Sequence, residues 1–128
     1  MSDLISQNLN MIFKTPKGET VHALKDLNFT LKKGELLTVL GPSGCGKTTL
    51  LNITAGFIRP TSGTITLNDK EIDGPGVERG MVFQQGALFE WLTVAENVNF
   101  GLRMKNEDPI KTQKKVDEWL EIVGLKGF

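Results

Sequence analysis

The composition of this 128-residue chain suits one globular domain with a hydrophobic core, because 39% of its residues are hydrophobic and 23% are charged. The 15 basic and 15 acidic residues give a formal net charge of zero, which argues against nucleic acid as the main partner. No apolar run reaches the roughly 20 residues of a membrane-spanning helix, and the first residues lack a signal-peptide pattern, so we expect any membrane role to be peripheral. The single cysteine, Cys45, excludes an internal disulfide and fits a reducing compartment.

The N-terminal part of the chain predicts an antiparallel hairpin that leads into a buried strand. Residues 4–13 have the mixed polarity of an edge strand, and the proline and glycine within residues 15–19 predict a turn. Residues 21–31 alternate between apolar and polar side chains, which predicts a second strand. After a further tight turn, the apolar run at residues 35–40 predicts a short buried strand.

Residues 41–49 read Gly-Pro-Ser-Gly-Cys-Gly-Lys-Thr-Thr, which matches the phosphate-binding pattern G-x-x-x-x-G-K-[ST]. The apolar run before the loop and the helical spacing of apolar residues over 49–55 predict the strand, turn and helix in which such a loop works. We therefore expect the chain to bind a nucleoside triphosphate. The residues expected to hold it are Gly41, Pro42, Ser43, Gly44, Cys45, Gly46, Lys47, Thr48 and Thr49.

The residue types in this loop suit an anion. Gly41, Gly44 and Gly46 let the backbone curl, so that successive N–H groups can point into one concavity. That concavity opens at a helix N-terminus, where unpaired donors and the helix dipole favour negative charge. The Lys47 ammonium can reach the β- and γ-phosphates, and the Thr48 hydroxyl can ligate Mg²⁺.

Short elements are predicted between the loop and Gln84. The helix is expected to end at Gly56, because glycine commonly follows the last helical residue. An alternating strand is predicted at residues 64–67, and another short strand begins at residues 71–72. Residues 80–83 predict a short buried strand that runs into Gln84.

The C-terminal part of the chain is predicted to be helical. Thr93 and Glu96 have the spacing of a capping box, so a helix is expected to begin directly after Thr93. Asp108 followed by Pro109 predicts the start of a second helix, which Gly124 ends. The apolar face of the second helix is expected to consist of Val116, Trp119, Leu120 and Val123.

Several stretches together carry a family resemblance. The phosphate loop continues into Leu-Leu-Asn and Ala-Gly-Phe within residues 36–57, and Pro-Thr-Ser-Gly-Thr-Ile follows at residues 60–65. Val-Phe-Gln stands at residues 82–84, and Leu-Thr-Val-Ala-Glu-Asn-Val at residues 92–98. Over nearly its whole length the chain resembles the ATP-binding subunit of an ABC transporter. The stretch at residues 74–80 is similar to the branch that imports nitrate, sulfonates and taurine.

The resemblance implies an α/β fold: the P-loop NTPase core of an ABC ATPase, with an N-terminal antiparallel β subdomain and the start of the helical subdomain. It implies a hairpin region at residues 1–34, a core from the phosphate loop to the Q-loop at residues 35–89, and the start of the helical subdomain at residues 90–128. The domain is therefore expected to be incomplete.

The resemblance also assigns roles outside the loop. Phe13 stands where the family has an aromatic residue that stacks on adenine, and Gln84 resembles the Q-loop glutamine that binds Mg²⁺ and senses the γ-phosphate during catalysis. Residues 85–91 would meet the membrane subunit, with Trp91 either a contact there or a half-buried structural residue. His22 is expected to be structural, since it does not match the family's switch histidine.

The chain departs from the family pattern in its catalytic motifs. It has no Leu-Ser-Gly-Gly-Gln signature, no apolar strand ending in Asp-Glu, no D-loop and no switch histidine. We therefore expect roughly the first half of a subunit, which binds ATP and Mg²⁺ with little or no hydrolysis. Without the neighbouring strands, apolar surface and open sheet edges are expected to be exposed, which favours instability, self-association or an altered fold.

The resemblance implies that the full subunit couples ATP hydrolysis to uptake of a small anion such as nitrate, a sulfonate or taurine. Its expected partners are a transmembrane permease subunit and a second ATPase subunit, with no nucleic acid, at the cytoplasmic face of the cell membrane. A nucleotide-binding module without hydrolysis stays open as an alternative. Another P-loop enzyme, such as a small kinase, is a further alternative.

Overall fold

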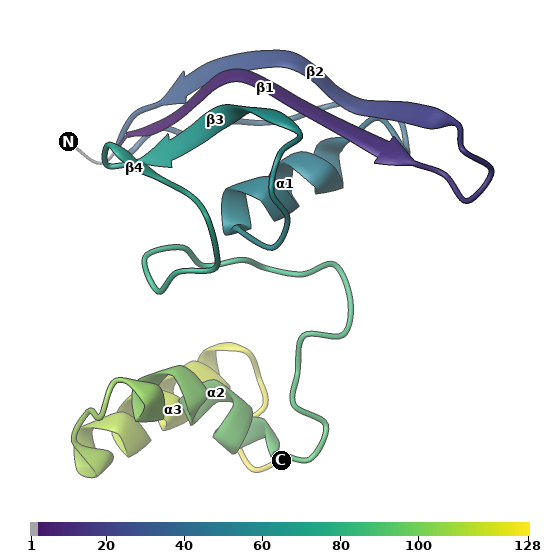
Figure 1. Ribbon diagram of the computed structural model, residues 1–128. Helices are drawn as coiled ribbons and strands as arrows, with labels where there is room; N and C mark the ends of the chain where they lie inside the picture. The colour runs from purple at the N-terminus through teal and green to yellow at the C-terminus, as the bar shows by residue number, and fades with distance from the viewer. Residues whose placement is uncertain (1–2) are drawn as a thin grey trace. The chain divides into compact units, whose positions relative to one another are not determined.

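The computed structural model describes residues 3–128, which form two compact units. The first unit ends at Met81, and the second runs from Val82 to Phe128. The first combines a four-stranded sheet with helix α1, whereas the second contains helices α2 and α3 (Figure 1).

The first unit is built on a sheet with the strand order β2-β1-β3-β4. Strand β1 (Leu4–Lys14) pairs antiparallel with β2 (Thr20–Leu31) and with β3 (Ser62–Leu67). Strand β3 also pairs antiparallel with the short β4 (Lys70–Glu71). The predicted hairpin and the predicted strand at residues 64–67 are therefore confirmed, and the short strand that follows begins one residue earlier than expected.

The prediction that the first strand lies at an edge is wrong, because β1 has a neighbour on both sides. Its mixed polarity has another cause, which is hydrogen bonding within the sheet. The buried Ser6 hydroxyl donates a hydrogen bond to the Leu27 carbonyl oxygen at 2.9 Å. Asn8 and Asn10 belong to an irregular stretch of the β1–β2 pair. Polar residues are tolerated in a central strand when their polar atoms have partners.

Helix α1 (Lys47–Ala55) lies under the sheet and completes the core of the first unit (Figure 1). Ile53 on the helix packs with Leu9 and Ile65 of the sheet, and each of these three side chains is at most 1% exposed. As predicted, Gly56 ends the helix, with a φ of 83° that glycine adopts without strain.

Two predicted buried strands are wrong, because residues 35–40 and 80–83 are irregular in the structure. Leu36 is 92% exposed and Val82 is 97% exposed. Runs of this kind suit a strand that is covered on both faces and hydrogen-bonded to neighbouring strands. Among residues 3–128 no strand pairs with either run, so their apolar character alone cannot make them strands. The exposed apolar surface expected from the family resemblance is present at these residues.

The second unit contains α2 (Val94–Met104) and α3 (Pro109–Ile122), which begin where predicted. The capping box is formed, since the Glu96 N–H donates to the Thr93 hydroxyl at 3.3 Å and the Thr93 N–H donates to the Glu96 carboxylate at 2.8 Å. Asp108 caps α3 through hydrogen bonds from two backbone N–H groups to its carboxylate. No helix within residues 3–128 is long and apolar enough to cross a membrane.

The apolar face predicted for α3 is only partly confirmed. Val116 and Leu120 are buried with Thr112 at four-residue spacing, but Trp119 is 45% exposed and Val123 is 62% exposed. Helix α3 buries only the narrow stripe that packs in the α2–α3 cluster. A wider apolar face needs a second neighbouring element, and sequence periodicity does not tell whether one is present.

We expect Thr93→Ala to destabilise α2 by about 1 kcal/mol, because the mutation removes the N-cap hydroxyl that accepts from the Glu96 N–H. Thermal unfolding followed by the helical circular dichroism signal measures the change. Thr93→Ser keeps a hydroxyl cap and should behave like the unmodified chain. Equal melting curves for the alanine variant and the unmodified chain would contradict the assigned cap.

The same capping box predicts a pH dependence. Two hydrogen bonds to the carboxylate hold the pKa of Glu96 below its usual value of 4.5. The larger effect comes from the Thr93 backbone N–H and the smaller from the Thr93 hydroxyl. A carboxyl group with a lowered pKa stabilises the fold fully above the unfolded pKa, and this contribution is lost as the pH falls through the folded pKa. The helical signal should therefore weaken below about pH 4.5. Glu96→Gln keeps the capping geometry without titrating and should lack this part of the pH dependence.

Candidate functional site

The phosphate loop leads into α1 and opens into a pocket of the first unit with a volume of about 260 Å³. The pocket is formed by the end of the β1–β2 hairpin together with the loop and the first turn of α1. Its lining residues are Phe13, Val21, His22, Ala23, Gly44, Gly46, Lys47, Thr48 and Thr49. The structure therefore brings Phe13 and the phosphate loop together in one site, although they are far apart in the sequence.

Gly46 fixes the geometry of the loop where it enters α1. It is the N-cap residue of the helix and has a left-handed backbone with a φ of 99°. A β-carbon at Gly46 would lie only 2.3 Å from the Ala23 carbonyl oxygen on β2. Only glycine permits both this backbone and this close approach. The helix begins without a side-chain cap, so the N–H groups of its first turn are suited to a ligand.

The Lys47 ammonium lies within the loop. Its Nζ donates hydrogen bonds to the carbonyl oxygens of Gly41 and Pro42, each at 2.7 Å, and lies 3.5 Å from Cys45 Sγ. A phosphate oxygen carries more negative charge than a carbonyl oxygen and forms a stronger charge-assisted hydrogen bond. A bound phosphate can therefore attract this ammonium away from the loop carbonyls.

The Cys45 side chain lies beside Gly41 at the start of the motif. A β-carbon at Gly41 would lie 2.5 Å from the Cys45 sulfur, so the thiol side chain occupies the space beside Gly41. The thiol itself belongs to an exposed residue. The other loop residues named from the sequence, Pro42 and Ser43, are exposed in the same turn.

Two residues named from the family resemblance lie in the second unit. Gln84 is exposed in an irregular segment, and its expected contact with Mg²⁺ stays a prediction. Trp91 is 79% exposed and packs its ring beside Phe89 at a centroid distance of 5.4 Å. The alternative of a half-buried structural tryptophan is therefore wrong for Trp91, whereas its contact with a membrane subunit stays a prediction.

Three pocket residues were missed from the sequence, namely Val21, His22 and Ala23. His22 was expected to be a structural strand residue, but it also lines the pocket. The signal that could have found these residues is the hairpin register, in which Phe13 pairs with Val21 across the turn at residues 15–19. Once Phe13 is assigned to a site, this pairing brings the start of β2 to the same place.

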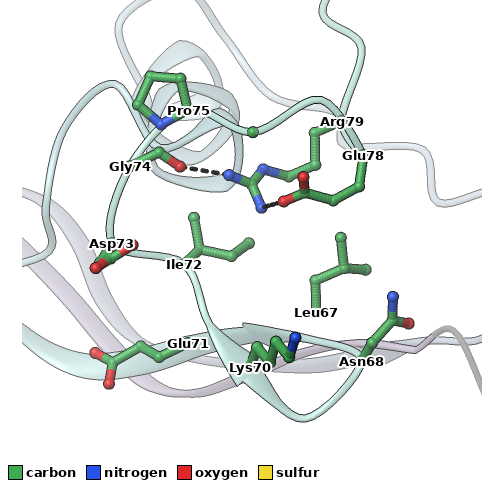
Figure 2. Close-up of a pocket in the computed structure, with 11 residues that line it drawn as sticks. Leu67, Asn68, Lys70, Glu71, Ile72, Asp73, Gly74, Pro75, Glu78 and Arg79 are labelled. Atoms are coloured by element: carbon green, nitrogen blue, oxygen red, sulfur yellow. Dashed lines mark hydrogen bonds and ion pairs between the residues drawn. The ribbon is translucent and has the colours of Figure 1, made fainter.

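A larger pocket of about 490 Å³ lies elsewhere in the first unit, between residues 67 and 79 (Figure 2). Figure 2 shows the Arg79 guanidinium held by the Gly74 carbonyl oxygen and the Glu78 carboxylate, so its Nη atoms are already engaged. Glu71 and Asp73 add further negative charge to the lining. None of its lining residues belongs to a helix, so this pocket does not offer the helix N-terminus that suits a polyphosphate. The smaller pocket at the phosphate loop is therefore the candidate nucleotide site.

Comparison with known proteins identifies the family of the chain. Residues 24–128 match the family described as ABC transporter. The chain belongs to the ABC transporter family. The phosphate loop, the residues that lead to Gln84 and both helices of the second unit all fall within the region that matches this family.

Two curated relatives of this ABC transporter chain match along its full length. A protein of Pelagibacter ubique (strain HTCC1062) is 90% identical over 128 residues, and one of Roseobacter denitrificans (strain ATCC 33942 / OCh 114) is 59% identical over 128 residues. Both are described as taurine import ATP-binding protein TauB. The chain covers 48% of each of them, so it spans about half the length of these relatives.

A solved structure confirms the predicted fold. The ATP-binding cassette MJ0796, described as dimeric, in a post-hydrolysis state and bound to ADP and Pi, superimposes with a TM-score of 0.81 at 29% sequence identity. The match covers 97% of this chain and 58% of that cassette. The fold is therefore that of an ABC ATPase cassette with an antiparallel β sheet and helices, and it is incomplete, as expected.

Proposed function

We propose that this chain is the ATP-binding part of an ABC importer subunit, and that the longer protein couples ATP hydrolysis to the uptake of a small anion, with taurine the favoured substrate. The observation that carries the proposal is the pocket in which Phe13 and the phosphate loop meet. The choice of taurine is supported by the relatives from Pelagibacter and Roseobacter, both described as taurine import ATP-binding proteins.

The phosphate end of the site would hold the ATP phosphates. Backbone N–H groups at the start of α1 provide donors in the region where the helix dipole favours negative charge. Lys47 would exchange its two carbonyl contacts within the loop for contacts to the β- and γ-phosphates. Phosphoryl transfer depends on such positioning and on neutralisation of charge.

The residues present also fit Mg²⁺ bound together with the nucleotide. Thr48 lines the pocket at the start of α1, where its hydroxyl would be one ligand, and Gln84 is proposed as a second. No group of three or more His, Cys, Asp or Glu side chains within residues 3–128 could hold a metal ion. This fits Mg²⁺, which commonly binds through substrate phosphates, water and few protein ligands.

The hairpin end of the site would hold the adenine. Phe13 is 41% exposed at the pocket and pairs across the hairpin with Val21, so an aromatic ring and an aliphatic side chain lie together there. An aromatic face and an apolar neighbour suit a purine ring, which stacks without needing a specific hydrogen bond.

For the longer protein we further propose a permease partner at the membrane and a second ATP-binding subunit. The permease follows from the import function described for the taurine relatives, and Trp91 is the proposed contact on this chain. The second subunit is supported by the MJ0796 cassette structures, which are described as dimeric.

We expect Phe13→Ala to weaken MgATP binding by roughly tenfold, because the stacking of a base on an aromatic ring is worth about 1–3 kcal/mol. Isothermal titration calorimetry with MgATP measures the change. Phe13→Tyr keeps the ring and should bind like the unmodified chain. Magnesium tripolyphosphate, which has no base, should bind the alanine variant and the unmodified chain equally. If Phe13→Ala binds MgATP as tightly as the unmodified chain, adenine does not stack on this residue.

A further inference from the structure

The β1–β2 pair is interrupted in its middle. Its register shifts three times between Ser6 and Ile12. Within this stretch Asn8 has a φ of 47° on β1 and Asp26 has a φ of 44° on β2, so each strand contains one residue in the left-handed region. Asparagine and aspartate adopt this backbone more readily than most residues. Irregularities of this kind bend a strand and increase its twist, and Figure 1 shows both strands curving over α1.

The side chains of Asn10 and Asn28 form hydrogen bonds to the backbone of both left-handed residues. The Asn8 N–H donates to Asn28 Oδ1 at 2.8 Å, and the Asn8 carbonyl oxygen accepts from Asn10 Nδ2 at 2.7 Å. The Asp26 N–H donates to Asn10 Oδ1 at 3.0 Å, and the Asp26 carbonyl oxygen accepts from Asn28 Nδ2 at 2.8 Å. Each amide group therefore contacts the backbone of both left-handed residues and links the two strands. We call this irregular part of the β1–β2 pair, around Asn8 and Asp26, the bend.

A third strand packs closely at the same place. A β-carbon at Gly63 on β3 would lie only 2.1 Å from the Asn8 carbonyl oxygen, and Gly63 itself has a φ of 80°. The position of Asn8 is thus restricted by β3 as well as by the two amides. The bend is a closely packed feature of the sheet.

The part of the hairpin beyond the bend forms one wall of the candidate nucleotide site. Phe13 and Val21 line the pocket from this part, and the Ala23 carbonyl oxygen lies 2.3 Å from the position that a β-carbon at Gly46 would take. The direction in which the hairpin leaves the bend therefore sets where Phe13 lies relative to the phosphate loop.

We propose that Asn10 and Asn28 are positioning residues for the nucleobase end of the site. They act through the backbone of Asn8 and Asp26, which holds the bend and so fixes where Phe13 lies in the pocket that it shares with the phosphate loop. This inference rests on the proposed nucleotide-binding function. It adds the residues that set the geometry of the pocket wall formed by Phe13 and Val21, where the adenine would bind.

The test compares a ligand that has a base with one that does not. Asn10→Ala should weaken MgATP binding by about tenfold and leave magnesium tripolyphosphate binding unchanged, because only the base reaches the hairpin wall. Asn28→Ala is a second, independent variant with the same expected pattern. Asn68→Gly is the matched control, since Asn68 also has a left-handed backbone, with a φ of 54°, but lies in the turn between β3 and β4. It should bind both ligands like the unmodified chain.

A second control separates positioning from general destabilisation. Ile72→Val shortens a buried core side chain of the same unit, directly after β4 and outside the bend. It should lower the melting temperature and leave the ratio of the two ligand affinities unchanged. The proposal is overturned if the asparagine variants leave this ratio unchanged, or if Ile72→Val alters it equally. If the unmodified chain binds neither ligand, the proposed function fails first.

Amide hydrogen exchange of the unmodified chain tests the proposal without a variant. MgATP should slow exchange at the Asn8 and Asp26 amides as well as in the phosphate loop, because a base bound at the wall restrains the bend. Magnesium tripolyphosphate should slow exchange in the phosphate loop alone. Equal protection at the bend by both ligands would contradict the positioning role.

Discussion

Replacing Lys47 by alanine is expected to weaken MgATP binding by about 100-fold. Among residues 3–128, Lys47 is the one lysine or arginine that lines the candidate pocket, and its ammonium already lies within the loop at 2.7 Å from two carbonyl oxygens. Two charge-assisted hydrogen bonds to phosphate oxygens, each worth about 1.5 kcal/mol, account for a change of this size. Isothermal titration calorimetry of the variant and the unmodified chain with MgATP measures it.

Lys70→Ala is the matched control for this experiment. Lys70 is an exposed lysine of the same unit, on β4, and it lines the larger pocket instead of the phosphate-loop pocket. Its removal should leave MgATP binding unchanged. If Lys70→Ala weakens binding and Lys47→Ala does not, the nucleotide site lies in the larger pocket.

Gly46→Ala is expected to destabilise the first unit by about 3–5 kcal/mol, because it combines backbone strain with a steric clash. The φ of 99° is unfavourable for alanine, and the new β-carbon would lie 2.3 Å from the Ala23 carbonyl oxygen. Either the start of α1 or the β2 strand must then move, and both form walls of the pocket. Urea unfolding measures the loss of stability, and MgATP affinity should fall with it.

Gly44→Ala separates the two contributions. Gly44 also has a left-handed backbone, with a φ of 78°, but a β-carbon there would meet nothing within 4 Å. The alanine variant should lose only about 1–2 kcal/mol from backbone strain. Equal destabilisation by both substitutions would show that the contact between Gly46 and β2 does not restrict the loop.

The parts of this fold that local chemistry determines could be predicted from the sequence. The glycines and Lys47 define the phosphate loop, and Gly56 ends α1 because its backbone is left-handed. The capping box of Thr93 and Glu96 and the cap at Asp108 place the starts of both later helices. In each case the residues that specify the geometry lie within a few positions of one another.

The parts that depend on distant neighbours could not be predicted in the same way. Residues 35–40 and 80–83 have the apolar character of buried strands, but a strand also needs a neighbouring strand, and no strand within residues 3–128 pairs with either run. Trp119 fits the apolar face of α3 in the sequence, yet α3 buries only a narrow stripe. The polar residues of β1 suggested an edge because hydrogen bonds to the next strand are not visible in a single segment.

In the candidate site, too, the residues of a local pattern could be predicted, whereas those that depend on strand pairing could not. The loop residues were found from their spacing, and Phe13 from the family resemblance. Val21, His22 and Ala23 follow from the hairpin register, which depends on the irregular stretch around Asn8 and Asp26. Neither Asn8 nor Asp26 lies in a sequence pattern that predicts such a bend.

The central claim is that ATP binds where the hairpin meets the phosphate loop, and backbone amide chemical shifts test it most directly. MgATP added to the isotopically labelled chain should shift the amides of residues 41–49 and of Phe13, Val21 and Ala23, with saturation at one nucleotide per chain. Shifts confined to residues 67–79, around the larger pocket, would contradict the claim. So would an unchanged spectrum in the phosphate loop at saturating nucleotide.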